Sequence, residues 1–266
     1  MDTLSNKMRY INELKNNWLM INHVPETLLN DKEFMLEAVK IEGYTISHAS
    51  NIIQNNKEIV MEAVKKESWL VRYASQELKD DKEIIEEAVR KDGLTLYHAS
   101  KRLRDDKEIV MGAVNQEGGS LQYASERLRG DKDIVSKAIE KDICNLEFAS
   151  DSLKNDKDIM IKAIKSGEYS LADISEELRG NREVVLAAIK KDSKNWIHAS
   201  EEIQEEIKKY TLPRWISAET KRQTETKLPP LNSDIKFLIR VAKDMQQKER
   251  ITPNVMAREQ HQSMAI

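Results

Sequence analysis

The chain has 266 residues, of which 33% are charged and 39% hydrophobic, with eight glycines and five prolines. This composition is typical of a helical protein and argues against a sheet protein or a disordered chain. Because 43 basic and 46 acidic residues leave a net charge of −3, we expect no general attraction to nucleic acid or to a membrane surface.

The cellular location is indicated by the cysteine count and by the apolar pattern. Cys144 is the single cysteine, so no internal disulfide can form, which fits a reducing compartment. No apolar run approaches the ~20 residues of a membrane helix, and the first residues lack the apolar region of a secretory signal. We therefore expect a cytoplasmic protein without a membrane span, which acts in the cytosol of a host cell if it is exported.

Residues 1–29 are predicted to form an N-terminal cap and a partial repeat. Within "MRYINELKNNWLMI", Met8, Ile11, Leu14 and Trp18 share one face of a helix. A stack of repeats needs such a helix, because its first repeat would otherwise expose an apolar face.

Residues 30–207 repeat with a constant period of 25 residues. The clearest mark is a small pair, mostly Ala–Ser, that ends at Ser50, Ser75, Ser100, Ser125, Ser150, Ser175 and Ser200, and a weaker copy, "HVP", ends at Pro25. Such a strict period is typical of stacked repeat proteins. We predict an all-α fold, a right-handed α-solenoid of about seven two-helix repeats with capping helices at both ends.

The first helix of each repeat is expected to begin at an N-cap that is followed, three residues later, by an acidic residue. The predicted caps are Asn30, Asn55, Asp80, Asp105, Gly130, Asn155 and Gly180, and the acids are Glu33, Glu58, Glu83, Glu108, Asp133, Asp158 and Glu183. Both features stabilise the start of a helix. Gly43, Gly93 and Gly118 are expected to end three of these helices in the left-handed conformation.

The second helix is expected to start at a short polar residue and to continue through the Ala–Ser pair. The predicted starts are Thr45, Thr95, Ser120, Asn145, Ser170 and Asn195. Leu70 interrupts this series, so its helix should fray or start earlier. The Ala–Ser pair would let neighbouring helices approach closely, and the serine hydroxyl would bond back to its own helix.

The stretch "LRDDKEIVMGAVNQEGGSLQYASERLRGDKDIV" resembles a family of tandem helical repeats known only as a domain of unknown function. The resemblance covers residues 20 to 205 and implies no activity, cofactor or catalytic residue. The family occurs in intracellular bacteria, protists and large DNA viruses, so the resemblance also implies a host-directed effector. The repeat "SLADISEELRG" departs from the pattern at Asp173 and Ile174, which puts its packing in question.

The period fails after Ile207. Residues 208–232 contain three prolines and are predicted to form a polar linker. Residues 233–250 are predicted to form one amphipathic helix, and residues 251–266 a disordered tail. That helix either folds back as the C-terminal cap, which is the favoured interpretation, or docks on a partner or on a second copy of the chain.

Three histidines, His48, His98 and His198, share one register of the repeat. Neighbouring helices pack ~8–10 Å apart, so these histidines cannot share a metal ion, and we expect neither a metal nor a cofactor. Asp173 and His198 are neighbours in this register, and their pairing is the basis of the weakest hypothesis, an enzyme. Cys144 lies in a register with large apolar residues and is expected to be half-buried.

One basic residue in each repeat forms a lysine ladder, which comprises Lys32, Lys57, Lys82, Lys107, Lys132, Lys157 and Arg182. The ladder could follow a phosphate backbone, so nucleic-acid binding is the alternative function. The acidic residues from Glu33 to Glu183 run beside it and cancel much of its field. A self-paired, solvated face is therefore the favoured interpretation, and nucleic acid is the disfavoured partner.

Two registers vary between repeats while the rest of the repeat is constant. The first row is Leu36, Met61, Glu86, Met111, Ser136, Ile161 and Leu186, and the second is Ser47, Arg72, Tyr97, Gln122, Glu147, Ala172 and Ile197. Variation indicates exposure, and methionine suits adaptable binding surfaces. We therefore predict a non-catalytic protein-binding module whose first row, with Arg72 and Tyr97, contacts another protein. Partial burial of the first row between repeats is the competing interpretation.

Overall fold

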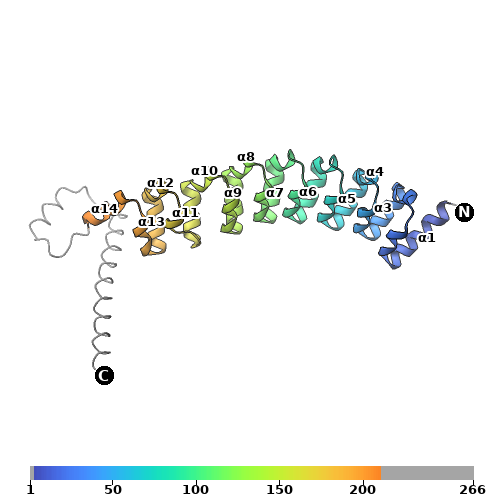
Figure 1. Ribbon diagram of the computed structural model, residues 1–266, viewed down its shortest axis with the longest axis horizontal. Coiled ribbons are helices and arrows are strands. Elements are labelled where there is room, and N and C mark those ends of the chain that lie inside the picture. Colours follow the sequence, from blue (N-terminus) through green and yellow to red (C-terminus); the bar gives the residue numbers. More distant parts are fainter. Residues whose placement is uncertain (1–2, 211–266) are drawn as a thin grey trace, which may run out of the picture. The chain divides into compact units, whose positions relative to one another are not determined.

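The computed structural model describes residues 3–210 and the side chains of residues 5–206. This part of the chain is an all-α solenoid without a β-strand, as predicted. It belongs to two compact units, which comprise residues 1–153 and 154–266. Within unit 1, the long helices of successive repeats lie side by side, as Figure 1 shows from α3 to α9. None of the described helices is long and apolar enough to cross a bilayer.

Each repeat of unit 1 holds three helical pieces, whereas the sequence predicted two. The long pieces are α1 (Thr3–Asn16), α3 (Lys32–Ile41), α5 (Lys57–Lys66), α6 (Lys82–Lys91), α7 (Lys107–Gln116) and α9 (Lys132–Lys141). The second pieces are 3₁₀-helices, η1 (Trp18–His23), η2 (Gly43–His48), η3 (Ser68–Tyr73), η5 (Gly93–His98), η7 (Gly118–Tyr123) and η8 (Ile143–Phe148). The third pieces are single turns, α2 (Glu26–Leu29), α4 (Asn51–Gln54), η4 (Leu78–Asp80), η6 (Leu103–Asp105), α8 (Glu126–Arg129) and α10 (Asp151–Lys154).

Unit 2 repeats the same order of pieces over its described residues. These are α11 (Lys157–Ser166), η9 (Leu171–Asp173), α12 (Glu176–Arg179), α13 (Arg182–Lys191), η10 (Ser193–His198) and α14 (Glu201–Tyr210). The departure at Asp173 and Ile174 shortens η9, yet Ile174 is buried, so packing is maintained there.

The Ala–Ser pair breaks the predicted second helix instead of running through it. Ala49 and Ser50 have extended backbones, with ψ angles of 149° and 162°. The alanine is buried at this break in each repeat that has one, and Ser50, Ser125 and Ser175 lie at the N-cap of the third piece. Serine favours this position because its hydroxyl can bond to the backbone outside a helix.

The long helices begin one residue later than predicted. Their N-caps are Asp31, Asn56, Asp81, Asp106, Asp131, Asp156 and Asn181, and each side chain accepts a bond from a backbone N–H of the first turn. The predicted spacing of three residues between the cap and the acid is therefore wrong, because the acid lies at the second helical position. It still lies at the positive end of the helix dipole.

Close approach, not a left-handed turn, explains the glycines at position 93 and its equivalents. Among the described glycines only Gly167 has a positive φ, so the predicted left-handed stops at Gly43, Gly93 and Gly118 are wrong. A Cβ on Gly93 would lie 2.2 Å from the carbonyl oxygen of Ala113 in the next repeat. Leu70 does not make its repeat fray, because η3 forms in the same register and Leu70 is fully buried.

The N-terminal segment is a copy of the repeat with a longer first helix. Leu14 is buried and occupies the register of Val39, while Lys7 pairs with Asp31 at 2.6 Å as the lysine ladder does. The prediction that Met8 lies on the buried face is wrong, because its side chain is 62% exposed. Residues before position 30 therefore complete the stack as well as capping it.

The last described helix omits the break between the third piece and the next long helix. Glu206 occupies the register of the N-caps, where earlier repeats have Asp or Asn, and α14 continues through it to Tyr210. Residues 208–210 of the predicted linker are thus helical. The rest of that linker, the predicted helix at 233–250 and the predicted tail at 251–266 lie outside the described residues.

Candidate binding surface

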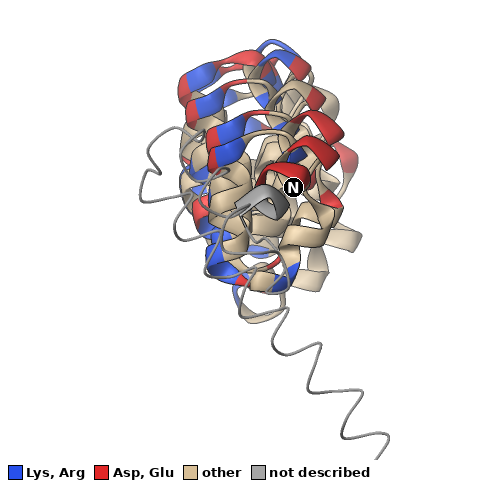
Figure 2. Cartoon of the chain, turned by 90° about the vertical axis from the view of Figure 1, so that its left-hand side faces the viewer, with Lys and Arg blue, Asp and Glu red and all other residues tan. Residues whose placement is uncertain are grey.

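The lysine ladder is paired with acidic side chains of the following repeat. The Nζ atom of Lys57 lies 2.8 Å from both Asp81 and Glu83, which are the N-cap and the first-turn acid of α6. Equivalent pairs are formed by Lys32, Lys82, Lys107, Lys157 and Arg182. Figure 2 accordingly shows blue and red segments close together on the ribbons of successive repeats. The predicted self-paired face is confirmed for these six residues.

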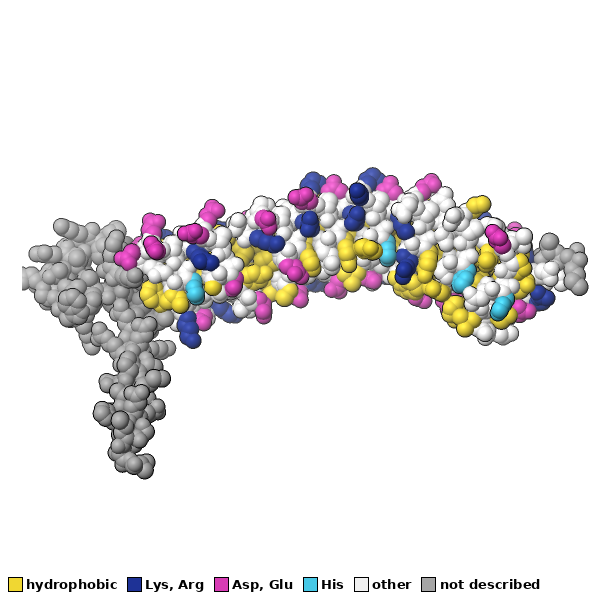
Figure 3. Space-filling view, in the orientation of Figure 1, with side chains coloured by type: hydrophobic (Ala, Val, Ile, Leu, Met, Phe, Trp, Pro, Cys, Tyr) yellow, Lys and Arg dark blue, Asp and Glu magenta, His cyan; other side chains and the backbone are white. Residues whose placement is uncertain are grey.

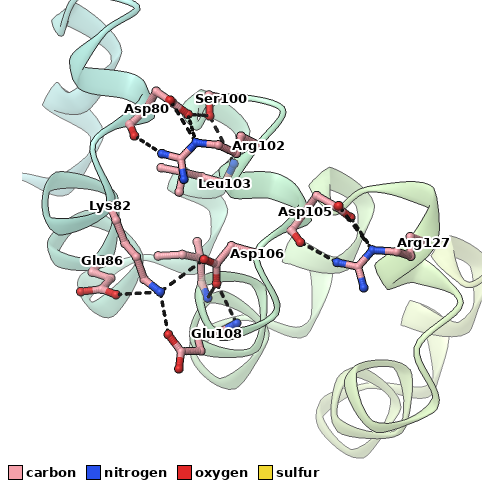
Figure 4. A network of polar contacts seen from close by, with 11 residues as sticks. Asp80, Lys82, Glu86, Ser100, Arg102, Leu103, Asp105, Asp106, Glu108 and Arg127 are labelled. Carbon is pink, nitrogen blue, oxygen red and sulfur yellow. Dashed lines mark hydrogen bonds and ion pairs between the residues drawn. The ribbon is translucent and has the colours of Figure 1, made fainter.

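A second polar network joins the serine of one repeat to the repeat before it. The hydroxyl of Ser100 donates to Asp80 and accepts from the N–H of Leu103 at 3.2 Å, and Arg102 Nε donates to Asp80 at 3.1 Å. Asp105, Ser125 and Arg127 form the same arrangement one repeat later, and Figure 4 shows the contact between Asp105 and Arg127 beside the complete Asp80 network. The hydroxyl therefore bonds forward and across repeats, so the predicted bond back to its own helix is wrong.

The first variable row is largely half-buried between helices. Leu36, Met61, Met111, Ser136 and Ile161 are half-buried, and Leu186 is buried; only Glu86 is exposed. Variation in this row therefore does not reflect exposure. The competing interpretation, partial burial of the row, describes these side chains correctly. Its role in binding stays a prediction.

The second variable row lies on the 3₁₀-helices and is exposed apart from Ser47, which is half-buried. The exposed members are Arg72, Tyr97, Gln122, Glu147, Ala172 and Ile197. Tyr97 and Ile197 are large apolar side chains that remain 61% and 54% exposed. The second row is thus the variable row that a partner can reach without displacing the core.

The carboxylate of Asp173 is bonded to Ser170, the N-cap residue of η9. This carboxylate accepts from the hydroxyl of Ser170 at 2.7 Å and from the N–H of Ser170 at 2.8 Å. These two bonds, with a smaller contribution from His198, lower the pKa of Asp173 below its usual value. Cys144 is exposed, so its predicted half-burial is wrong. Within the described part of the chain, no group of three or more His, Cys, Asp or Glu side chains could hold a metal ion.

Half-buried aromatic side chains form a cluster on the first three 3₁₀-helices of unit 1. The ring centroids of Trp18 and Tyr44 are 5.6 Å apart, and those of Tyr44 and Trp69 are 5.8 Å apart. Tyr73 contacts both Tyr44, at 5.8 Å, and Trp69, at 6.3 Å. A hydrogen bond to Tyr44, followed by burial, raises the pKa of Tyr73.

A smaller aromatic cluster occupies η5 and η7. Tyr97 packs edge-on against His98 at 5.1 Å and against Tyr123 at 5.3 Å. Figure 3 shows hydrophobic side chains and histidines along one edge of this face, with basic side chains next to them. Aromatic edges beside cations are a common feature of recognition surfaces.

Several basic side chains of unit 1 have no acidic partner among residues 5–206, and four of them are called the basic set. They are Arg72, Lys79, Arg104 and Arg129. The guanidinium of Arg72 lies over the ring of Tyr73, 5.4 Å from its centroid. The other three occupy one register, four residues after the serine of the Ala–Ser pair in their repeats. With Lys154 and Arg179, which follow at the same spacing, this register is cationic in five successive repeats.

In other repeats, the residues equivalent to Lys79, Arg104 and Arg129 bond to backbone carbonyl groups near the 3₁₀-helix. Gln54 Nε2 donates to the carbonyl of Ala49 at 3.1 Å, and Arg179 Nε donates to that of Ile174 at 3.0 Å. Both carbonyls follow the 3₁₀-helix of the same repeat. The Nε atoms of Arg104 and Arg129 are buried without a hydrogen-bond partner among the described residues, so these two cations retain unused donors.

Arg72 lies close enough to Lys79 and His98 for its charge to affect both side chains. Burial, and then the charge of Arg72, lowers the pKa of Lys79. Burial, and then the charges of Lys79 and Arg72, lowers the pKa of His98. Tyr73, Tyr97, His98 and Tyr123 together with the basic set are called the aromatic–basic surface below. The sequence pattern singled out Arg72 and Tyr97 as contact residues and His98 only in the argument against a metal site. It did not identify Lys79, Arg104 and Arg129, whose signal is a cation that recurs at one position of the repeat.

The chain was compared with protein families, curated proteins and solved structures. A family model described as "Domain of unknown function (DUF4116)" matches residues 14–54, 31–79, 56–104, 81–129, 131–179 and 156–204. No curated protein matches the chain, and no solved structure does. Apart from 81–129 and 131–179, successive family matches overlap by about one repeat, in agreement with the stacked architecture.

Proposed function

Because the chain belongs to the repeat family described as a domain of unknown function, DUF4116, we propose that it is a non-catalytic scaffold that binds another protein. The observation that carries the proposal is the contrast between a constant frame and a variable exposed row. The frame comprises the N-caps, the lysine ladder and the buried alanines. On it, the exposed second row changes from Arg72 to Tyr97 to Gln122.

Repeat proteins commonly bind partners through such surfaces, since stacking fixes the backbone and leaves the exposed side chains free to vary. A partner protein has an irregular surface and suits a row whose chemistry differs at each step. The proposal places this binding in the cytosol, and in a host cytosol if the chain is an exported effector.

The two alternative functions receive less support from the geometry. A ladder that follows a nucleic-acid backbone needs cations free to contact phosphates, whereas the paired members of the lysine ladder already contact carboxylates. An enzyme centred on Asp173 and His198 would need a carboxylate available to the histidine, whereas both hydrogen bonds to Asp173 come from Ser170. Alanine at either position should leave any activity of the chain unchanged.

The test is affinity purification from host-type lysate with chemical cross-linking, followed by binding measurements with each purified candidate. The Arg72→Ala/Tyr97→Ala variant alters the exposed row, and the Met61→Glu/Met111→Glu variant alters the half-buried row. Melting temperatures of both variants serve as the control for folding. A purified partner that binds the wild type and loses affinity for either folded variant supports the proposal, and the affected variant identifies the row. Failure of every purified candidate to bind directly would contradict it.

A further inference from the structure

The charge of the aromatic–basic surface is not balanced by the fold. Of the described basic side chains in the lysine ladder, those of Lys57, Lys82 and Lys107 each contact two acids of the following repeat. The basic set has no such contact within residues 5–206, although the whole chain carries a net negative charge. Positive charge gathered on one face of an acidic protein attracts negative groups of a partner.

The hydrogen-bond donors without partners also favour a negatively charged ligand. Buried donors without partners are costly, and a buried Nε on both Arg104 and Arg129 is unusual in a well-packed repeat. Carboxylates accept strongly from guanidinium groups, and the two bonds can form in parallel. Arg104 and Arg129 are half-buried as whole residues, so a carboxylate group of a ligand can approach their guanidinium groups from the surface.

The aromatic rings add a second requirement on the ligand. Tyr97 is 61% exposed, and Leu94 beside it in η5 is 42% exposed. Water contacts both apolar side chains, so burying them against an apolar side chain of the ligand would be favourable. The ligand should thus combine negative charge with at least one apolar or aromatic side chain.

These observations favour a protein segment over a nucleic acid. A phosphate backbone presents identical charges at a regular spacing, which suits a cation repeated in one register. The register that follows the serine stays cationic as far as Arg179, whereas the exposed row beside it changes from Arg72 to Tyr97, Gln122 and Glu147, so the surface as a whole does not present identical charges at a regular spacing. A short acidic segment with a few apolar side chains matches this limited and uneven pattern.

We propose that the aromatic–basic surface binds an acidic segment of a partner protein that also carries an apolar or aromatic side chain. The inference rests on the proposed function and specifies the chemistry of the partner. Carboxylates would contact Arg72, Lys79 and Arg104, and the apolar side chain would lie against Tyr97.

Random peptides displayed on phage and selected on the full chain would test this chemistry. The expected result is enrichment of sequences that contain both acidic and apolar or aromatic residues. In fluorescence polarisation, the Arg72→Gln/Lys79→Gln/Arg104→Gln variant should bind a selected peptide at least about tenfold more weakly, since three charge-assisted contacts are lost.

The matched control is Lys57→Gln/Lys82→Gln/Lys107→Gln, which removes the same charge from the lysine ladder. It should retain affinity within about threefold, because long-range attraction is screened by salt while direct contacts are not. The NMR-measured pKa of His98 should rise when the peptide binds, and melting temperatures would establish that both variants are folded.

Three results would overturn the inference: selected peptides without acidic residues, equal losses in both variants, or no selection of any peptide. Tighter binding of mixed-sequence single-stranded DNA, lost in the first variant alone, would replace the acidic segment with nucleic acid. If a purified partner from the proposed-function test binds both charge variants normally, the scaffold proposal stands and this inference fails.

Discussion

Gly93 and Gly112 differ in what a side chain would meet, although they lie in adjacent repeats. A Cβ on Gly93 would lie 2.2 Å from the backbone oxygen of Ala113, whereas one on Gly112 would meet nothing within 4 Å. Gly93→Ala should therefore destabilise the chain by about 1–3 kcal/mol, because the backbone must move to accommodate it. Gly112→Ala should stabilise it by about 0.5–1 kcal/mol, since alanine favours a helix interior.

Urea unfolding followed by circular dichroism would measure both glycine variants. Equal effects of the two substitutions would contradict the close approach of the repeats at Gly93. The comparison is informative because both variants add the same methyl group and differ only in its surroundings.

The carboxylates of Asp80 and Asp105 should make stability depend on pH. Bonds from Ser100 and then Arg102 lower the pKa of Asp80, and Ser125 and Arg127 lower that of Asp105. Each contributes stability that is complete above the ordinary carboxyl pKa of about 3.8 and is lost as the pH falls through the lower folded-state value. The melting temperature should accordingly fall steeply below about pH 4.

Removing the two serine donors should weaken this dependence. Ser100→Ala/Ser125→Ala should lose less melting temperature than the wild type between about pH 6 and about pH 3. Ser150→Ala is the matched control, because Gly130 replaces the aspartate in that repeat and the Ser150 hydroxyl pairs with Ser152 at 2.8 Å. A change in pH dependence with Ser150→Ala of the same size would contradict the assignment.

At the scale of the element, two adjacent aspartates have different roles. Asp106 is the N-cap of α7 and accepts from the N–H groups of Glu108 at 2.9 Å and Ile109 at 3.2 Å. Asp106→Ala should cost about 1 kcal/mol and increase hydrogen exchange in the first turn of α7. Asp105→Ala should leave exchange in that turn unchanged, because Asp105 instead contacts Ser125 and Arg127.

Hydrogen-exchange mass spectrometry on peptides that span the start of α7 would distinguish these roles. If exchange increased with Asp105→Ala and not with Asp106→Ala, Asp105 would be the N-cap of α7, as the sequence pattern predicted. The pair of variants matters because both remove one carboxylate from the same loop.

The sequence pattern predicted the repeat, its period and its buried rows, because these depend on residue spacing that recurs in each copy. It placed the N-caps one residue early, since "DD" at positions 105 and 106 offers two residues that can cap a helix. It also missed the extended break at Ala49–Ser50, because alanine, serine and the flanking apolar residues are compatible with one continuous helix. Local preference alone does not distinguish these possibilities.

The candidate surface was harder to predict than the fold. Arg72 and Tyr97 were identified because their register varies between repeats. Lys79 and Arg104 were not, because the sequence does not show which acidic side chains lie near their register. Whether a cation is balanced depends on which side chains the stack brings together, and that information comes from three-dimensional contacts.

At the scale of the whole molecule, the contacts of unit 1 connect each repeat mainly to its neighbours. The backbone N–H of Ser100 donates to the backbone carbonyl of Lys79, and that of Ser125 donates to the backbone carbonyl of Arg104, so the bonds join adjacent repeats. The ladder pairs and the Ser–Asp bonds do the same. In such an array, stability is approximately a sum of repeat terms and nearest-neighbour terms, and unfolding need not be a single all-or-none step.

A local defect should consequently spread over a limited distance. Gly93→Ala disturbs the contact between the repeats that contain α6 and α7, so hydrogen exchange should increase most in these two helices. The increase should be smaller in α5 and α9, which pack against them, and should be absent from α1. A uniform increase from α1 to α9 would show that unit 1 unfolds as one cooperative body. The neighbour-limited pattern would instead mean that each repeat can change its exposed row at little cost to distant repeats, as a scaffold for varied partners requires.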